Sequence, residues 1–235
     1  MPRRRQSAML PDILERALRA GFRRAYVHVQ VDPERYLRHI RRAYSLPIQS
    51  WSDMQRIHEE TLDPIALRVI TSAKRTAALE GTGLGFGGLL TIVPDMGILS
   101  AITIRLLQRL SLIYGFEYTT QEEVTDLWLA AASAAGVELG REFIEKQAIE
   151  RVVPRVIDRI AARVGVEVAE KWSGRLIPIL SAGIGGSLNY YFVRSWGRRA
   201  QRHFLERHRQ ARARALESSD VKPFLLNPIV GRFNP

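Results

Sequence analysis

A nearly uncharged segment, GTGLGFGGLLTIVPDMGILSAITI at residues 81–104, most restricts the folds open to this chain, because only Asp95 interrupts it. The segment is long enough to cross a bilayer, for which about 20 apolar residues suffice. Its glycines also suit a phosphate-binding loop or two helices that approach closely. These three alternatives predict three different kinds of protein.

A phosphate-binding loop is the least favoured of the three. A dinucleotide fingerprint needs a strand before its glycines, and a P-loop ends in Gly-Lys-Ser or Gly-Lys-Thr. Here the glycines follow a segment with helical spacing and continue as Gly-Gly-Leu-Leu at residues 87–90. We therefore expect no nucleotide site and no cofactor.

Pro94 and Asp95 separate the other two alternatives. In a membrane span, proline removes a helical hydrogen bond, and the aspartate costs about 2.5–3.5 kcal/mol, which takes roughly five leucines or isoleucines to offset. In a buried hairpin, both residues fall in the first turn of the second helix, where a carboxylate meets free N–H groups and the positive end of the dipole. We favour the buried hairpin and keep a membrane-inserted hairpin as the alternative.

The rest of the chain shows helical spacing of apolar residues and no sustained strand-like alternation. Local signals predict helix ends: N-caps followed by proline, capping boxes and a left-handed C-cap, at Asp32-Pro33, Asp63-Pro64, Ser52 with Gln55, Thr120 with Glu123, and Gly115. Residues 141–172 predict two helices that break or kink near Pro154. A second uncharged run, Leu176–Val193, leads into an arginine-rich helix.

These signals predict an all-α protein, a single compact multi-helix bundle with two glycine-rich apolar hairpins and a basic C-terminal helix. We expect a basic N-terminal tail at residues 1–10, a helical domain at 11–219, and an extended, proline-rich tail at 220–235. The absence of cysteine excludes disulfides and thiolate metal sites.

The positive charge gathers near the two ends of the chain. The net charge is +11, with eleven arginines against four acidic residues in residues 1–44 and eight against Glu206 in residues 194–216. Such clusters suggest an anionic partner, either lipid headgroups or nucleic acid. The basic start is not followed by the apolar core of a secretory signal, so we expect a cytoplasmic protein.

The last helix is the main candidate for function. Its apolar stripe carries aromatic residues, as in a helix that binds an anionic membrane interface. A core-packed helix with a solvated arginine face explains the same pattern equally well. The expected membrane-binding or anion-binding residues are Trp196, Arg194, Arg198, Arg199, Arg202, Arg207 and Arg209.

Catalytic signals are weak. Histidine and carboxylates cluster once, at His58, Glu59, Glu60 and Asp63, with too few histidines for a metal site, and we read them as a solvated helix face. His203 and His208 are assigned to the basic surface. Asp95, a carboxylate in an apolar setting, is the one weak candidate for an acid or base, although a helix-start role is favoured.

Two blocks of the sequence resemble the EcsC protein family of bacteria. The first, Gly81–Tyr118, has the pattern Thr-Gly-x-Gly, an apolar stretch, Pro-Asp, a helix and Tyr-Gly; the second, Leu176–Arg207, matches the closing segment of the family. The matching positions are Thr82, Gly83, Gly85, Pro94, Asp95, Tyr114 and Gly115, then Pro178, Gly183, Asn189, Arg194, Gly197 and Ala200.

The resemblance implies a bacterial, membrane-linked protein that faces the cytoplasm, because the family is named after a gene beside ABC-transporter genes. It carries over no activity or catalytic residue. We therefore expect a non-catalytic module on the inner membrane face that holds anionic lipid or a membrane-protein partner such as an ABC transporter. An enzyme acting on a lipid or membrane-bound substrate is the alternative. A nonspecific nucleic-acid binder is less favoured, since sequence-specific binding motifs are missing.

Overall fold

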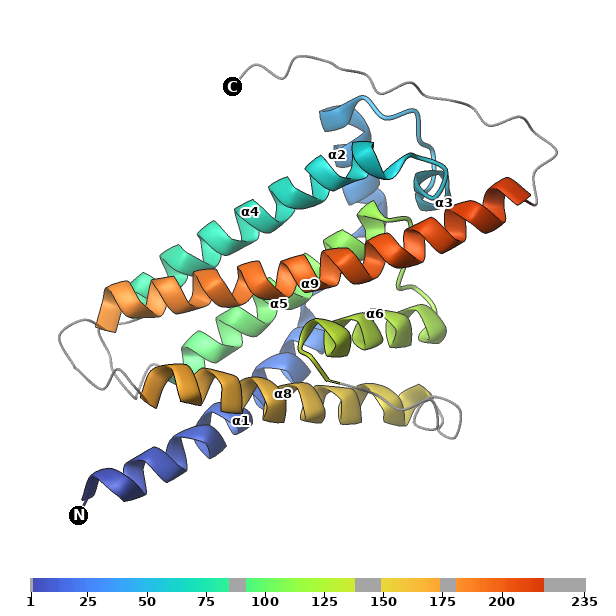
Figure 1. Ribbon diagram of the computed structural model, residues 1–235. Helices are drawn as coiled ribbons and strands as arrows, with labels where there is room; N and C mark the ends of the chain where they lie inside the picture. Colours follow the sequence, from blue (N-terminus) through green and yellow to red (C-terminus); the bar gives the residue numbers. More distant parts are fainter. Residues whose placement is uncertain (1, 85–91, 138–148, 174–180, 218–235) are drawn as a thin grey trace.

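All regular elements in the described part of the chain are α-helices that pack together. A computed structural model describes residues 2–84, 92–137, 149–173 and 181–217 (Figure 1). The helices are α1 (Pro2–His28), α2 (Pro33–Tyr44), α3 (Trp51–Met54), α4 (Glu59–Leu84), α5 (Ile92–Ile113), α6 (Gln121–Ala134), α8 (Ile149–Ser173) and α9 (Ser181–Glu217). The predicted all-α fold is confirmed.

The long helix α9 lies along α4, and α5 packs against both of them (Figure 1). On the other side of α5, α1 crosses the bundle and contacts α5 and α8, while α6 contacts α8 and α9. The ends of α4, α5, α8 and α9 that flank the two uncharged runs lie at the same end of the bundle, on the left in Figure 1. We call this the uncharged end.

The first uncharged run forms the C-terminal part of α4 and the first half of α5, which pack side by side. Pro94 and Asp95 lie in the first turn of α5, as the hairpin prediction requires. From Met96 to Ile113, α5 is long and apolar enough to cross a membrane, but 67% of these residues are buried in the bundle, as in the core helix of a soluble protein. Residues 85–91 of the run lie outside the described part.

Several predicted helix ends are confirmed. The Asp32 carboxylate accepts a hydrogen bond from the Arg35 amide at 3.0 Å to begin α2. Thr120 and Glu123 form the reciprocal capping box of α6. After α5, Gly115 has φ +85°, and the Phe116 amide donates to the Ser111 carbonyl at 2.9 Å, which closes a Schellman motif.

Other predicted helix ends are wrong. The capping box of α3 joins Ser50 to Asp53, not Ser52 to Gln55. Helix α4 begins at Glu59 and continues through Pro64, and α8 has no break at Pro154, where a break or a kink was predicted. Both prolines lie near the start of their helix. There, the packing of the longer helix stabilises the protein by more than the loss of one backbone hydrogen bond destabilises it.

The expected tails have different outcomes. Helix α1 begins at Pro2, so residues 2–10 continue a helix where a tail was expected. The expected tail at residues 220–235 lies outside the described part.

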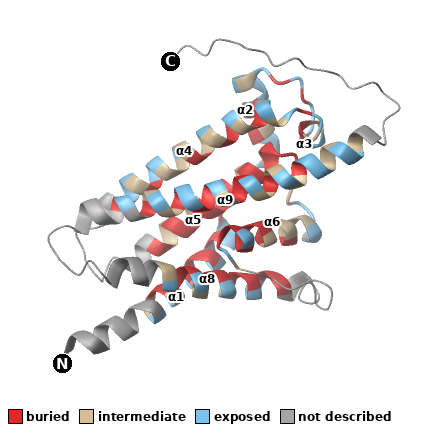
Figure 2. Cartoon of the chain, viewed as in Figure 1, coloured by how far each residue is buried: buried red, intermediate tan, exposed pale blue. Residues whose placement is uncertain are grey.

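Large aromatic side chains fill the core, and the helices turn their buried faces toward it (Figure 2). The Phe22 ring stacks on Trp196 with centroids 5.8 Å apart and meets the edge of Trp128 at 6.4 Å. At Gly197, a Cβ atom would come within 3.1 Å of Ile70 and Leu106. This glycine therefore lets α9 approach α4 and α5 closely.

Candidate functional site

Helix α9 buries one side and exposes a row of arginines on the other. Val193, Ala200 and Phe204 are fully buried on the core side. Arg194, Arg198 and Arg202 follow one another at intervals of four residues, and all three are exposed. Residues spaced by four lie one above another on a helix, so the three guanidinium groups share one face. With half-exposed Arg199 beside them, we call these four residues the basic row.

Trp196 does not belong to this exposed face, although the sequence placed it in the membrane-binding set. Only 1% of it is exposed, and its ring lies against Phe22 and against Phe192, with centroids 5.8 and 5.2 Å away. Its indole nitrogen has no hydrogen-bond partner in the described part of the chain. Trp196 is therefore a core residue that fixes α9 against α1.

Two further arginines of the predicted set are neutralised by acidic residues on other helices. Arg207 donates to Asp126 of α6 at 2.7 Å and lies over the Phe116 ring, 4.5 Å from its centroid. Arg209 binds Glu59 of α4 through two nitrogens, at 2.5 and 3.0 Å. The hydrogen bond from Arg209 holds the pKa of Glu59 below its usual value. Both arginines therefore have less free charge to offer a ligand.

The structure describes no such partners for the basic row. In the described ranges, no acidic side chain forms an ion pair with any of its four arginines. Among the described hydrogen bonds, Arg198 donates to the Gln201 amide oxygen at 3.4 Å. The Nε atom of Arg199 is buried and has no hydrogen-bond partner among the described residues. Guanidinium groups that form no ion pair with an acidic side chain are suited to bind phosphate or carboxylate oxygens.

An open groove of about 490 Å³ runs beside the basic row, between α9 and the end of α6. Arg199, Arg202 and Arg207 line it together with His203, Ser133, Gln210 and one acid, Glu206. Burial, assisted by Arg207, lowers the pKa of His203, so this ring favours its neutral form. The groove could receive an anionic group at its arginines.

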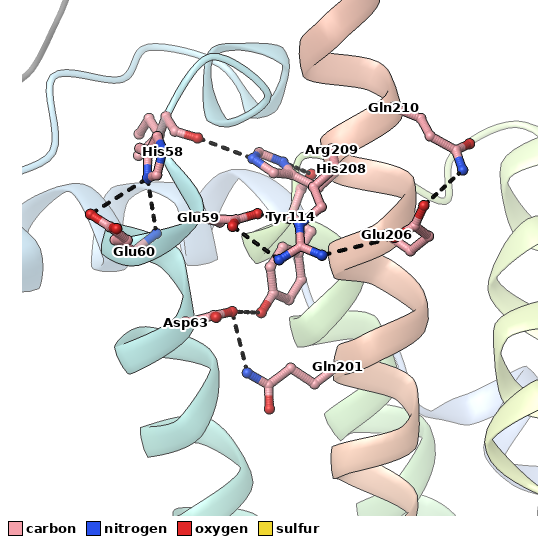
Figure 3. Close-up of polar contacts among 11 residues, drawn as sticks. His58, Glu59, Glu60, Asp63, Tyr114, Gln201, Glu206, His208, Arg209 and Gln210 are labelled. Carbon is pink, nitrogen blue, oxygen red and sulfur yellow. Dashed lines mark hydrogen bonds and ion pairs between the residues drawn. The ribbon is translucent and has the colours of Figure 1, made fainter.

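A polar cluster ties α4, α5 and α9 together near the other end of α9 (Figure 3). The Tyr114 hydroxyl donates to the Asp63 carboxylate at 2.6 Å, and the Gln201 amide donates to the same oxygen at 3.3 Å. Burial and the Asp63 carboxylate raise the pKa of Tyr114, which keeps its proton. Asp63, expected as an N-cap, instead joins three helices.

His208 lies in the same region and is fully buried, so its assignment to the surface was wrong. Its ring nitrogens lie 3.1 Å from the Tyr114 carbonyl oxygen and 3.0 Å from that of Ile57 (Figure 3). Both contacts are hydrogen bonds only when both nitrogens carry a proton. The sequence contains a pattern that predicts this burial, because His208 follows Ala200 and Phe204 at intervals of four on the buried stripe.

The described part includes only some of the family-motif positions with their side chains. Tyr114 is buried, Gly115 forms the C-cap of α5, and Asn189 is 5% exposed. Thr82 and Gly83 lie in the last turn of α4, Pro94 and Asp95 in the first turn of α5, and Gly183 in that of α9, but their side chains are not described. Gly85 and Pro178 lie outside the described part. A catalytic role for Asp95 therefore stays a prediction.

No group of three or more histidine, aspartate or glutamate side chains is placed to hold a metal ion in the portion of the chain that the structure describes. The predicted cluster at residues 58–63 is divided among different contacts. His58 lies 3.8 Å from Glu60, whereas Glu59 and Asp63 face α9. The expectation of a solvated helix face thus holds for Glu60 alone among the three acids.

Comparison with known proteins identifies the family. The sequence model of the EcsC protein family matches residues 2–208. Protein EcsC of Bacillus subtilis (strain 168) is 30% identical over 150 residues, which cover 60% of this chain and 61% of that protein. The chain thus spans about three-fifths of this relative's length, and no solved structure matches it. With both motif blocks inside the matched region, the chain belongs to the EcsC protein family.

Proposed function

We infer that this protein is a non-catalytic binding module that holds anionic lipid at the cytoplasmic face of the bacterial membrane. The basic row carries the proposal, because its four arginines lack acidic partners among the described residues while Arg207 and Arg209 on the same helix are paired. An exposed set of unpaired guanidinium groups is free to bind phosphate.

The charge of the basic row is sufficient for useful affinity. Each basic residue near an anionic membrane surface contributes about 1 kcal/mol. Four such residues together give roughly 4 kcal/mol, or about a thousandfold in partitioning, before any apolar contact is added. This attraction weakens with salt over the Debye length, as expected for a reversible surface contact.

Close packing supports a preformed binding surface. Gly197 lies between Arg194 and Arg198, where α9 touches Ile70 and Leu106. The neighbouring Trp196 and Ala200 are buried in the core. Because α9 is held on this side, its arginines keep their spacing without a partner, and binding need not order the helix first.

A membrane-protein partner is the second form of the proposal. The family resemblance suggests an ABC transporter or another membrane protein, and the same arginines would then lie beside the lipid that surrounds it.

Vesicle sedimentation tests the proposal. We expect the full chain to pellet with phosphatidylglycerol vesicles and not with phosphatidylcholine vesicles. The triple variant Arg198→Glu, Arg199→Glu and Arg202→Glu should weaken this binding at least about a hundredfold, because three favourable contacts become unfavourable.

The matched control is Arg35→Glu, Arg41→Glu and Arg42→Glu on α2, which changes the net charge equally at exposed positions. Equal losses for the two triple variants would show that net charge matters and the basic row does not. If DNA bound to the basic row in a salt-dependent way and phosphatidylglycerol failed to compete, the nucleic-acid alternative would replace the proposal.

A further inference from the structure

The uncharged end of the bundle also presents exposed hydrophobic side chains. Leu79, near the end of α4, is 74% exposed, the highest value among the large hydrophobic residues of the described part. Tyr191, on the N-terminal part of α9, is 63% exposed. Because α4 and α9 run antiparallel and pack together, both side chains belong to the same end of one helix pair.

Basic and aromatic side chains accompany them. The Lys74 ammonium group lies 4.9 Å from the centroid of the Tyr190 ring, and this ring meets the edge of Tyr191 at 5.8 Å. Arg75 is exposed on α4, and Arg194 follows Tyr190 by one helical turn. Tyrosine, lysine and arginine side chains are typical of protein segments at membrane–water interfaces. There the apolar tyrosine ring contacts lipid, while its hydroxyl and the charged groups stay hydrated.

The position of these residues along α9 fits the depth of a bilayer. Helix α9 begins at Ser181 and carries no charged residue before Arg194. At about 1.5 Å per residue, Tyr190 and Tyr191 lie roughly 15 Å from the start of the helix, which is about one leaflet of a 30 Å hydrocarbon core. A helix start directed at the membrane would thus place both tyrosines at headgroup depth.

We propose that the uncharged end docks into the interface of an anionic bilayer, with α9 directed toward the membrane instead of lying flat on it. The docking surface consists of Leu79, Tyr190, Tyr191, Lys74, Arg75 and Arg194. The inference rests on the proposed function and adds the orientation of the bundle, in which Arg194 reaches the headgroups first and Arg198 and Arg202 follow about 6 and 12 Å farther along α9. It agrees with the neutralised state of Arg207 and Arg209, which this orientation keeps away from lipid.

The charge and composition of the docking surface favour a lipid bilayer as its binding partner. Among the described side chains at this end, Lys74, Arg75 and Arg194 outnumber the exposed acid Glu80, so the described surface complements lipid phosphates. The other strongly exposed hydrophobic residue, Val27, lies at the C-terminal end of α1 next to Tyr26, which packs against Trp128. Val27 therefore serves as a matched control.

Single cysteines test the orientation directly, because the chain contains none. Tyr191→Cys is compared with Ala213→Cys, about 33 Å farther along the same helix, and with Val27→Cys, whose native side chain is also 63% exposed. Each variant carries a nitrobenzoxadiazole fluorophore and is mixed with phosphatidylglycerol vesicles. We expect a blue shift and quenching by brominated lipid at position 191 and neither effect at positions 27 and 213.

Equal responses at positions 191 and 213 would show that α9 lies flat, which overturns this inference and leaves the proposed function intact. A response confined to position 27, or one at 191 that requires an added membrane protein, would also overturn it. As a second measurement, Leu79→Ser with Tyr191→Ser should weaken pelleting at least about tenfold, whereas Val27→Ser should not. A native chain that fails to pellet overturns the proposed function and this inference together.

Discussion

At the scale of single residues, the contacts of α9 divide into those that local pattern could predict and those that it could not. Trp196 and His208 lie on the same buried stripe as Ala200 and Phe204, so helical spacing alone could have placed them inside. The pairing of Arg209 with Glu59 joins residues 150 positions apart. Such a pair depends on the packing of α9 on α4, which a one-dimensional pattern does not contain.

The contacts of His208 yield a prediction about stability. The His208→Ala variant removes the ring nitrogens that lie within hydrogen-bond distance of the buried carbonyl oxygens of Ile57 and Tyr114, and it opens a cavity. Each unsatisfied buried group costs about 1–3 kcal/mol, so we expect the free energy of unfolding to fall by roughly 2–5 kcal/mol. Urea denaturation followed by circular dichroism measures the loss.

The control for this prediction is His203→Ala on the same helix. His203 is half-buried, and its described ring contact is an edge-on approach to Phe204, with centroids 5.8 Å apart. We expect this variant to lose less than about 1 kcal/mol, as is usual for a residue without buried hydrogen bonds. Similar losses for both variants would contradict the bridging role of His208.

At the scale of whole helices, the sequence predicted ends that are set by local chemistry. Asp32 before Pro33, Thr120 with Glu123, and Gly115 act within one or two turns, so tertiary packing leaves them unchanged. Pro64 and Pro154 were misread because packing of the longer helices α4 and α8 outweighs one missing hydrogen bond. Helix existence was therefore predictable, and helix length depended on tertiary contacts.

Two glycines with different amounts of space around them test how closely α9 must approach its neighbours. Gly197→Val would push side-chain atoms against Ile70 and Leu106, where a Cβ alone already reaches 3.1 Å. We expect the variant to lose about 1–3 kcal/mol of stability from overpacking. Gly97→Ala in α5 meets no described atom within 4 Å and should gain about 0.5–1 kcal/mol from reduced backbone entropy.

Thermal unfolding of the two glycine variants measures whether the first substitution lowers the stability and the second raises it, as predicted. A stable Gly197→Val protein would mean that α9 can move away from α4 without cost. The spacing of the basic row would then no longer be fixed by packing on this side. A destabilised Gly97→Ala protein would instead point to contacts that the described residues do not include.

At the scale of the whole molecule, the fold gathers features that lie far apart in the sequence. The two uncharged runs flank helix ends that meet at one end of the bundle, and the basic row begins close to that end (Figure 1). The sequence predicted both runs and the arginines, but not that they would adjoin, because this requires the antiparallel packing of α4 and α9. The membrane proposal depends on this assembly more than on any single residue.

The acid dependence of stability is a property of the whole molecule, because carboxylates on several helices contribute to it. Arg209 lowers the pKa of Glu59 below 4.5. At Asp53 and Glu123, burial raises the pKa, but hydrogen bonds from the caps of α3 and α6 outweigh it and leave both values lowered. At Glu117, by contrast, burial and Glu123 raise the pKa. The unfolded chain therefore binds the first three protons more readily than the folded chain does.

These shifts predict that stability falls in acid. A carboxylate with a lowered folded pKa stabilises the protein fully above its unfolded value and loses this effect as the pH falls through the folded value. We therefore expect the urea midpoint to decline below about pH 4.5, with Glu117 opposing the trend only in part. Glu59→Gln should reduce the decline, because it removes the carboxylate whose pKa the Arg209 hydrogen bond lowers. A midpoint that stays constant or rises between pH 5 and pH 3 would contradict the assigned ion pair and caps, since each of them requires an ionised carboxylate.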